Sequence, residues 1–461
     1  MLRRVVGLLL GLLGTCGLGG TAAVAPAAAA STATPIPMAR LMSHTAFATP
    51  PTTTQCEAQL QLACYAPFQY HRAYDLGPLY RRGLNGKGQT IAIVDSFGYQ
   101  HIRGELKAFD KAFHLPPPPS FKIIQPAGPV PAYDPTARPS MFGWAIETSL
   151  DVEYAHAMAP KANIVLVETP VAETLGTGGF PAIVKAENHV VDHHMANVIT
   201  QSFGAPEIGF PSKASILGLR TAYENAARHG VSVLASSGDA GPTGPNSLDS
   251  QGFAATFFLR RTVNWPASDP LVTGIGGTQM HLNAAGNHTS PDSVWNDTAL
   301  FGSPSASGGG RSAVFSRPFY QHGVGHLRGR RGVPDISMSA AVDGAALVFL
   351  DAKVGAGPAG FYLIGGTSEA SPLFSGVVAI ADQWAGHGLG LLNPAIYRLL
   401  AHNAAGIVDV TQGTNTVTFP QGGSTHTVKG FNARHGYDLS TGVGTVDAAK
   451  FVPELVAAQG G

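Results

Sequence analysis

The chain has 461 residues, of which 44% are hydrophobic and 13% are charged, and its 29 basic and 29 acidic residues cancel. A globular protein carries about 25% charged residues, so this chain has about half the usual charge density and no basic surplus for binding nucleic acid. Its apolar content can support a large core, which argues against extensive disorder.

Residues 1–30 have the pattern of a secretory signal peptide. Positions 1–4 include two arginines, positions 5–13 are apolar, and small residues at 27–30 suit a cleavage site. The apolar run is shorter than the ~20 residues that span a bilayer, so we expect a secreted protein without stable membrane insertion after signal removal. A membrane anchor or a lipoprotein site at Cys16 is a weaker alternative.

Residues 31–64 form a leader, and its stretch 31–54 is rich in Ala, Thr and Pro. This composition predicts a flexible segment without a core of its own. The leader ends with Cys56 and Cys64. A close cysteine pair in an exported protein predicts a local disulfide rather than a metal site, because no further ligands stand nearby at a matching spacing.

Residues 65–461 contain no second low-complexity break and no repeat, so we expect one large domain. Short β-branched or apolar runs alternate with longer amphipathic ones, which predicts an α/β fold with a parallel sheet and helical crossovers. The expected strands are 90–94, 162–167, 196–200, 231–235 and 271–275, and the expected helices are 102–113, 145–157, 183–194 and 216–229. Reactive groups in such sheets usually lie at the carboxyl ends of the strands.

A candidate nucleophile stands in residues 365–372, which read Gly-Gly-Thr-Ser-Glu-Ala-Ser-Pro before an apolar stretch. A glycine-rich turn that delivers Ser368 to the amino end of a buried helix would expose its hydroxyl and direct backbone N–H groups at nearby negative charge. The alternative is that the serine only caps the helix.

A nucleophilic serine needs a base, and none of the 17 histidines stands in the His-Gly-Thr-His context of a subtilisin. Glu147 and Asp151 instead lie at i and i+4, so on a helix both carboxylates share one face, about 6 Å apart at Cβ. Two solvated acids are the alternative, but apolar and aromatic neighbours weaken it. Asp239 adds a third acid directly after the strand 231–235, where a tight Gly-Asp loop is the alternative.

Taken together, Glu147, Asp151, Asp239 and Ser368 in this order resemble the sedolisins, which are serine-carboxyl peptidases with a subtilisin-like fold. The resemblance runs from about residue 65 to residue 446 and includes residues 91–98, 201–204, 274–278, 307–312 and 333–335. It implies a three-layer α/β architecture with a central, mostly parallel sheet flanked by helices.

The resemblance also implies a role for each residue. Ser368 would attack the peptide carbonyl, Glu147 would take its proton, and Asp151 would orient Glu147 and share a proton with it. Asp239 would stabilise the oxyanion, for which its carboxyl must be protonated, so acidic operation follows. Asp95 occupies the acid position on the first strand and would extend the carboxylate network.

A calcium site is the second feature that the resemblance implies. Asp409 and Asp438 would supply carboxylates, and Val410, Arg434 and Gly436 would supply backbone carbonyls, which suits the oxygen preference of Ca²⁺. Arg434 stands where the family usually has glycine. The alternative is that the two aspartates only shape turns.

These features predict a monomeric, acid-active endopeptidase that acts on proteins or peptides. Two departures from the family pattern concern regulation and specificity: the stretch before the first strand is too short for the large prodomain of sedolisins, and Phe203 replaces an aromatic that is often Trp. A secreted pseudo-peptidase that binds without cleaving is the main rival. An Asp-His-Ser subtilase is a third possibility, which the missing histidine motif nearly excludes.

Overall fold

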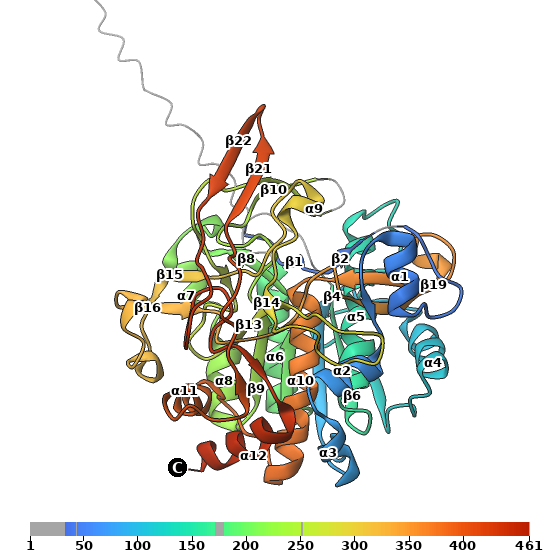
Figure 1. Cartoon of the computed structure of the whole chain (residues 1–461), viewed down its shortest axis with the longest axis horizontal. Coiled ribbons are helices and arrows are strands. Elements are labelled where there is room, and N and C mark those ends of the chain that lie inside the picture. The colour runs from blue at the N-terminus through green and yellow to red at the C-terminus, as the bar shows by residue number, and fades with distance from the viewer. Residues whose placement is uncertain (1–32, 43, 171–178, 250–251, 461) are drawn as a thin grey trace, which may run out of the picture. The chain divides into compact units, whose positions relative to one another are not determined.

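The computed structural model describes residues 33–42, 44–170, 179–249 and 252–460, so the expected signal peptide lies outside the described residues. Within those ranges, the centre is an eight-stranded sheet in the order β14-β13-β9-β7-β4-β6-β5, with β17 beside β13 (Figure 1). All pairs are parallel except β13 with β14. The strands are β4 Thr90–Ser96, β5 Phe121–Ile124, β6 Asn163–Thr169, β7 Val198–Gln201, β9 Ser232–Ser236, β13 Thr273–Gln279, β14 Ser293–Val294 and β17 Ile336–Ser339.

Both faces of this sheet are buried, as the side chains of β4 show. Ile91 and Ile93 belong to one hydrophobic core, and Ala92 and Val94 belong to another. The first core contains α5 (Ser140–Met158) and α10 (Thr367–Ala385), and the second contains α6 (Gly179–Asp192) and α8 (Thr221–His229). Because successive strand residues point to opposite faces, this alternation confirms the three-layer α/β fold that the sequence predicts.

The predicted elements are found with small changes of boundary. The helix expected at 102–113 is α4 (Ile102–Phe113), whereas the helix expected at 216–229 is split into α7 (Lys213–Leu217) and α8. Gly218 caps the end of α7, and glycine weakens a continuous helix. The remaining helices are α1 Thr53–Leu60, α2 Pro67–Ala73, α3 Gly77–Arg81, α9 Thr298–Phe301, α11 Asn393–Ala401 and α12 Ala448–Gln459.

Smaller sheets surround the central one. A four-stranded sheet has the order β2-β19-β18-β3, and the hairpin of β21 and β22 projects at the top of Figure 1. The strands outside the central sheet are β1 Ile36–Pro37, β2 Arg40–Leu41, β3 Cys64–Tyr65, β8 Phe203–Pro206, β10 Pro245–Leu248, β11 Ala254–Phe257, β12 Asn264–Trp265, β15 Gly310–Ser316, β16 Arg330–Val333, β18 Ala345–Leu350, β19 Gly360–Gly365, β20 Ile407–Val408, β21 Val417–Gln421, β22 Ser424–Val428 and β23 Thr445–Val446.

The leader differs from the flexible segment that its composition predicts. β1 pairs with β8, β2 pairs with β19, and Ile36 and Met38 are buried. The sheet edges offer the backbone partners that an Ala-, Thr- and Pro-rich sequence cannot provide for itself. Cys56 and Cys64 form the predicted disulfide.

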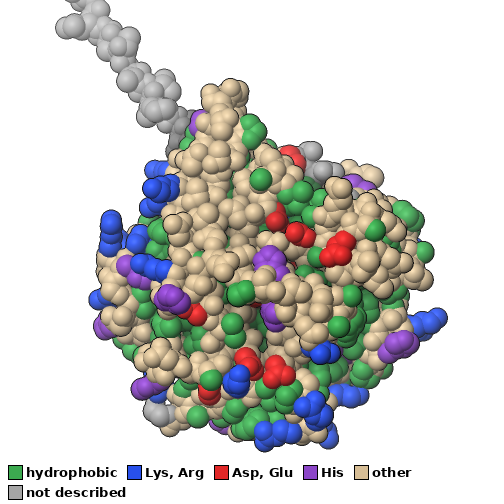
Figure 2. All heavy atoms as spheres, viewed as in Figure 1, with side chains coloured by type: hydrophobic (Ala, Val, Ile, Leu, Met, Phe, Trp, Pro, Cys, Tyr) green, Lys and Arg blue, Asp and Glu red, His purple; other side chains and the backbone are tan. Residues whose placement is uncertain are grey.

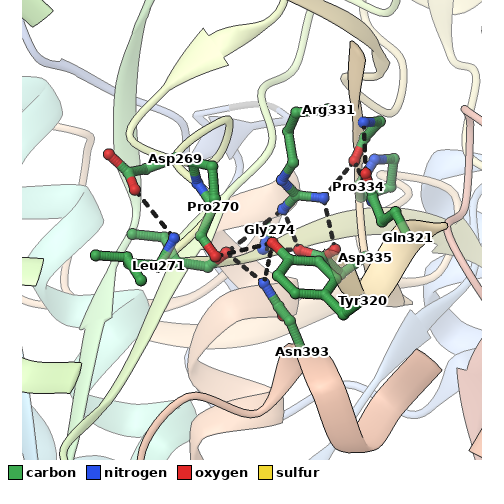
Figure 3. Close-up of polar contacts among 12 residues, drawn as sticks. Asp269, Pro270, Leu271, Gly274, Tyr320, Gln321, Arg331, Pro334, Asp335 and Asn393 are labelled. Atoms are coloured by element: carbon green, nitrogen blue, oxygen red, sulfur yellow. Dashed lines mark hydrogen bonds and ion pairs between the residues drawn. The ribbon is translucent and has the colours of Figure 1, made fainter. Parts of the chain in front are cut away.

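The motif at residues 333–335 belongs to the scaffold (Figure 3). The Asp335 carboxylate accepts hydrogen bonds from both terminal guanidinium nitrogens of Arg331. It also accepts from the hydroxyl of Tyr397 at 2.9 Å and from the N–H of Gly274 at 2.8 Å. Arg331 and Asp335 are fully buried. This buried pair therefore joins β16 and α11 to β13.

On the face drawn in Figure 2, most Lys and Arg side chains lie towards the rim, and acidic side chains lie nearer the centre. In the part of the chain that the structure describes, no helix is long and apolar enough to cross a membrane.

Candidate active site

Ser368 lies at the amino end of α10, directly after β19. The N-cap of this helix is Gly366, which has φ 107°, and none of the side chains that the structure describes caps it. A Cβ at Gly366 would come within 2.2 Å of the carbonyl oxygen of Met38, so only glycine fits this close approach. Ser368 is therefore not the helix cap, and its Oγ donates to the carbonyl oxygen of Ser202 at 3.2 Å.

Glu147 and Asp151 lie one turn apart on α5, and neither is exposed, which excludes two solvated acids on an open face. Oε2 of Glu147 accepts hydrogen bonds from the N–H groups of Met38 at 2.6 Å and Ala39 at 2.7 Å. Its Oε1 has no hydrogen-bond partner among the described residues. Oδ1 of Asp151 accepts from the hydroxyl of Ser202 at 2.7 Å.

Ser202 is a site residue that the sequence did not single out. It follows the last residue of β7, so it stands at the carboxyl edge of the sheet, where reactive groups gather. Its hydroxyl donates to Asp151, and its carbonyl oxygen accepts from both Ser368 Oγ and the N–H of Met38, each at 3.2 Å. Its position after a buried strand was the available clue.

Asp239 lies in the turn after β9 and faces the same helix end. Its Oδ1 accepts from the N–H of Thr367 at 2.8 Å and from the Thr367 hydroxyl at 2.7 Å. Its Oδ2 forms an ion pair with Nε of Arg40 at 3.3 Å. Arg40 is the second residue that sequence reasoning missed, because nothing in the leader's composition connects it to the acids.

Asp95 stands near the carboxyl end of β4 and is fully buried. Within the described chain, neither of its carboxyl oxygens meets the distance and angle of a hydrogen bond. The pKa of Asp95 is raised to about 7, mainly because the carboxyl is buried. The neighbouring Thr148 hydroxyl opposes this rise, and the negative charge of Glu168 adds to it. Asp95 in turn raises the pKa of both Glu147 and Asp151, so the structure brings it into the same electrostatic group.

Burial is the main influence on every acid of the site. It raises the pKa of Glu147 well above its ordinary value, Asp95 raises it further, and the nearby Ser368 hydroxyl lowers it. The pKa of Asp151 is raised well above its ordinary value by burial, Asp95 and Glu147, and lowered by Ser202. Burial also raises the pKa of Asp239 to about 6, although Arg40 opposes this shift. Acids held this close share protons, so the group holds protons in mild acid.

Residues 36–41 of the leader, which we call the strap, cross this site. Ile36 and Pro37 pair with Gly204 and Phe203, and Arg40 and Leu41 pair with Gly365 and Ile364. Between these pairs lies the peptide group that joins Met38 to Ala39. Its N–H, which belongs to Ala39, donates a hydrogen bond to Glu147. A Cβ at Gly366 would lie 2.2 Å from the carbonyl oxygen of Met38 and 2.6 Å from Oδ2 of Asp239. These two oxygens therefore both lie beside Gly366.

Comparison with known proteins decides the family. No protein-family model matches the chain. Kumamolisin of Bacillus sp. (strain MN-32) is 30% identical over 416 residues, which cover 87% of this chain and 66% of kumamolisin. A structure of Pseudomonas sedolisin, a serine-carboxyl proteinase complexed with pseudo-iodotyrostatin, matches 86% of this chain and 99% of the solved one, with a TM-score of 0.70 and 26% identity. The chain belongs to the sedolisin family.

Other sedolisin relatives are matched over shorter stretches. Sedolisin of Pseudomonas sp. (strain 101) is 32% identical over 275 residues, which are 59% of this chain and 43% of that protein. Human tripeptidyl-peptidase 1 is 27% identical over 313 residues, 65% of this chain and 50% of its own length. The matches thus span 43% to 66% of the length of these relatives.

The residues expected to hold calcium lie on two chain segments, 409–410 and 434–438, which a hydrogen bond between Asp409 and Gly436 joins. Asp409 Oδ2 accepts from the N–H of Gly436 at 3.0 Å, and Asp438 Oδ2 accepts from the N–H of Arg434 at 3.2 Å. Val410 is 1% exposed, and no donor among the described residues reaches its carbonyl oxygen. Asp438 Oδ1 also accepts from the N–H groups of Ser440 and Thr441, each at 2.8 Å. The two carboxylates and the Val410 carbonyl are oxygen donors of the kind that Ca²⁺ prefers.

Proposed function

We propose that this sedolisin is a secreted, acid-active serine-type endopeptidase that hydrolyses peptide bonds in proteins. The observation that carries the proposal is the Met38–Ala39 peptide group. Its N–H donates a hydrogen bond to Glu147, and its carbonyl oxygen lies beside Gly366, as Oδ2 of Asp239 does. Ser368 Oγ and the N–H of Met38 share the carbonyl oxygen of Ser202. A peptide held in this way presents each of its reacting atoms to the group that would act on it.

The chemistry follows from this arrangement. Oγ of Ser368 attacks the carbonyl carbon, and its proton passes to Glu147. The carbon–nitrogen bond then breaks, and Glu147 returns the proton to the leaving nitrogen, which already lies within hydrogen-bond distance in the strap. Water attacks the resulting ester by the same route in reverse. Asp151, whose carboxyl accepts a hydrogen bond from Ser202, shares a proton with Glu147. While Asp151 holds that proton, Glu147 is ionised and can accept the proton of Ser368.

Asp239 serves the developing oxyanion. A carboxyl can donate a hydrogen bond only when it is protonated, and burial raises the pKa of Asp239 to about 6. It therefore becomes a donor as the pH falls through this value. Because Arg40 lowers this pKa, a substrate without a cation in that place leaves Asp239 protonated to a higher pH. Acid activity has its physical basis here.

Cleavage within a chain is supported by the course of the strap. The polypeptide continues on both sides of the Met38–Ala39 group, with paired residues before and after it. A site that holds three residues on each side of a peptide bond accommodates an internal segment. The strap also occupies the atoms a substrate needs, so it must leave before another peptide binds.

Calcium and secretion belong to the same proposal. Asp409, Asp438 and the carbonyls of Val410, Arg434 and Gly436 would bind one structural ion, which would tie two chain segments together. The disulfide between Cys56 and Cys64 supports an extracellular location, because such bonds persist in oxidising compartments. A pseudo-peptidase is disfavoured, since all four catalytic positions are filled and adjacent.

The test is cleavage of a denatured protein by the purified chain and two serine variants. We expect activity at about pH 3–5 and little at about pH 8. Ser368→Ala should lower the rate by about 10⁴-fold or more. Ser375→Ala, in the same helix, is the control, because that hydroxyl donates to the carbonyl oxygen of Pro372 one turn earlier. Full activity in Ser368→Ala would overturn the mechanism.

A further inference from the structure

An apolar cavity adjoins the strap on the side that follows Met38. Its volume is about 490 Å³, and its lining includes Ala39 together with Phe142, Gly143, Ile146 and Phe253. The rings of Phe142 and Phe253 meet edge to face, with centroids 6.4 Å apart. Cavities of this size with aromatic walls are typical of ligand subsites. Because it adjoins the strap, the cavity is open to whatever peptide replaces it.

The strap indicates which substrate residue faces this cavity. Ala39, Arg40 and Leu41 of the strap all border this cavity, and the Arg40 guanidinium forms its ion pair with Asp239. Of these three residues, Ala39 directly follows the Met38–Ala39 peptide group. The N–H of Ala39 lies on Glu147, and Gly143, in the cavity wall, lies one helical turn before Glu147. Ala39 thus both borders the cavity and donates its N–H to Glu147, and its small methyl group leaves the space unfilled.

Gly143 keeps the space open. A Cβ at this position would come within 3.3 Å of Pro37 and 3.4 Å of the Phe253 ring. A Cβ here would already be in contact with Pro37 of the strap and with the Phe253 ring. The absence of a side chain at Gly143 leaves room between the helix and the bound peptide.

The lining also determines the kind of side chain that fits. Among the described residues that line the cavity, Arg40 of the strap is the only Arg, and none is Lys, Asp or Glu. The one other titratable side chain among these described lining residues is that of His44. Its Nδ1 lies 2.7 Å from the carbonyl oxygen of Ala356, and its ring stacks on Phe142. A charged substrate side chain would lose its hydration without gaining a partner, whereas an apolar one would bury area against the two rings.

We propose that this cavity is the specificity pocket for the residue directly after the cleaved bond, and that it selects a bulky apolar or aromatic side chain. The inference rests on the proposed peptidase function and deepens it by naming a preference of that site. The leader carries a small residue at this position, so it fits the site without using the pocket.

The test uses the full chain and quenched peptides that differ only in the residue after the cleaved bond: Ala, Leu, Phe or Asp. We expect kcat/KM for the Phe and Leu peptides to exceed that for the Ala peptide by roughly 10-fold or more, and the Asp peptide to be the poorest. Mass spectrometry of the products identifies the bond that is cut.

Variants of the wall make the test specific. Phe253→Ala and Phe142→Ala should each lower the Phe-to-Ala ratio of kcat/KM several-fold, because each removes one aromatic wall. Phe319→Ala is the matched control, since this phenylalanine is 68% exposed and lies outside the cavity lining; it should leave the ratio at the wild-type value.

The outcomes separate the two proposals. Equal rates across the series, or a preference that appears only at the third residue after the bond, would overturn the pocket assignment and leave the peptidase function standing. A wall variant with the wild-type ratio would also overturn it. Failure to cleave any peptide would overturn the proposed function, and the pocket assignment with it.

Discussion

The amide nitrogen of Ala39 lies 2.7 Å from Oε2 of Glu147, although 108 positions separate the two residues in the chain. The carbonyl oxygen of the same peptide group lies on the side of Asp239. One peptide group of the leader therefore stands between the two acids that hydrolysis would use. Under the proposed function, the leader lies where a substrate peptide would bind and has to leave before one can bind.

The ion pair between Arg40 and Asp239 should help to hold the strap in place. We expect Arg40→Ala to weaken the strap by about 1 kcal/mol, and so to raise the initial rate of peptide cleavage roughly fivefold at about pH 6. The gain should shrink at about pH 4, because Asp239 is then protonated and no longer pairs with the cation. Initial rates of the purified chain at both pH values measure this.

Lys87→Ala is the control for the loss of one positive charge, because Lys87 is exposed and its backbone, not its ammonium group, contacts Gln383. An equal gain in both variants, or a gain at Arg40→Ala that does not depend on pH, would show that the ion pair does not hold the strap.

The protonation state of Asp239 should limit activity on the alkaline side. Wild-type kcat/KM should fall above a pH of about 6, or somewhat higher once the Arg40 cation has left, because the ionised carboxylate cannot donate to the oxyanion. Asp239→Asn carries a permanent amide donor, so its profile should lack this fall. The measurement is kcat/KM from about pH 4 to about pH 8. Asp192→Asn, at the end of α6, is the control, and an unchanged fall in Asp239→Asn would contradict the assignment.

Much of the fold could be predicted from the sequence because buried strands and helices have characteristic patterns of apolar residues. The run at 90–94 is apolar on both faces, and the structure buries alternate residues of β4 in two cores. The acids of α5 were found because their spacing of four places them on one helix face. These predictions depend on local periods, which a single sequence displays.

The strap and Ser202 could not be predicted in the same way. The Ala-, Thr- and Pro-rich leader has no period that marks a strand, and its pairing depends on edges supplied by β8 and β19, far along the chain. Ser202 acts through its carbonyl oxygen as well as its hydroxyl, and a backbone atom leaves no trace in residue identity. Long-range backbone pairing therefore marks the limit of the sequence analysis.

The proposed calcium site should contribute to stability. Removing calcium with a chelator at about pH 6 should lower the melting temperature by several degrees, because an ion that binds only the folded chain stabilises it. Asp409→Asn should melt earlier and respond less to added calcium, whereas Asp192→Asn should respond as the wild type does. Calorimetry with and without free calcium measures both effects, and a midpoint that calcium leaves unchanged would argue against the site.

The buried pair of Arg331 and Asp335 should be essential to the scaffold. Asp335→Ala leaves the Arg331 guanidinium buried without its carboxylate and removes the acceptor of Tyr397 and Gly274. Breaking such a pair costs about 3–5 kcal/mol of unfolding free energy. Denaturant unfolding measures the loss, with Asp134→Asn as an exposed control. A loss below about 1 kcal/mol would show that the network is dispensable.

A buried acid away from the site should make the protein more stable in acid. Glu187 on α6 is fully buried, both of its carboxyl oxygens lack partners among the described residues, and burial raises its pKa well above the ordinary value. The folded chain keeps this proton where the unfolded chain has lost it, so the stabilising effect is complete below the ordinary glutamate pKa of about 4.3 and is lost as the pH rises towards the folded pKa. In Glu187→Gln, the side chain at this position has no proton to lose. The melting temperature of this variant should therefore match the wild type at about pH 4 and exceed it at about pH 7, with exposed Glu57→Gln as the control. A difference that is the same at both pH values would contradict this origin of acid stability.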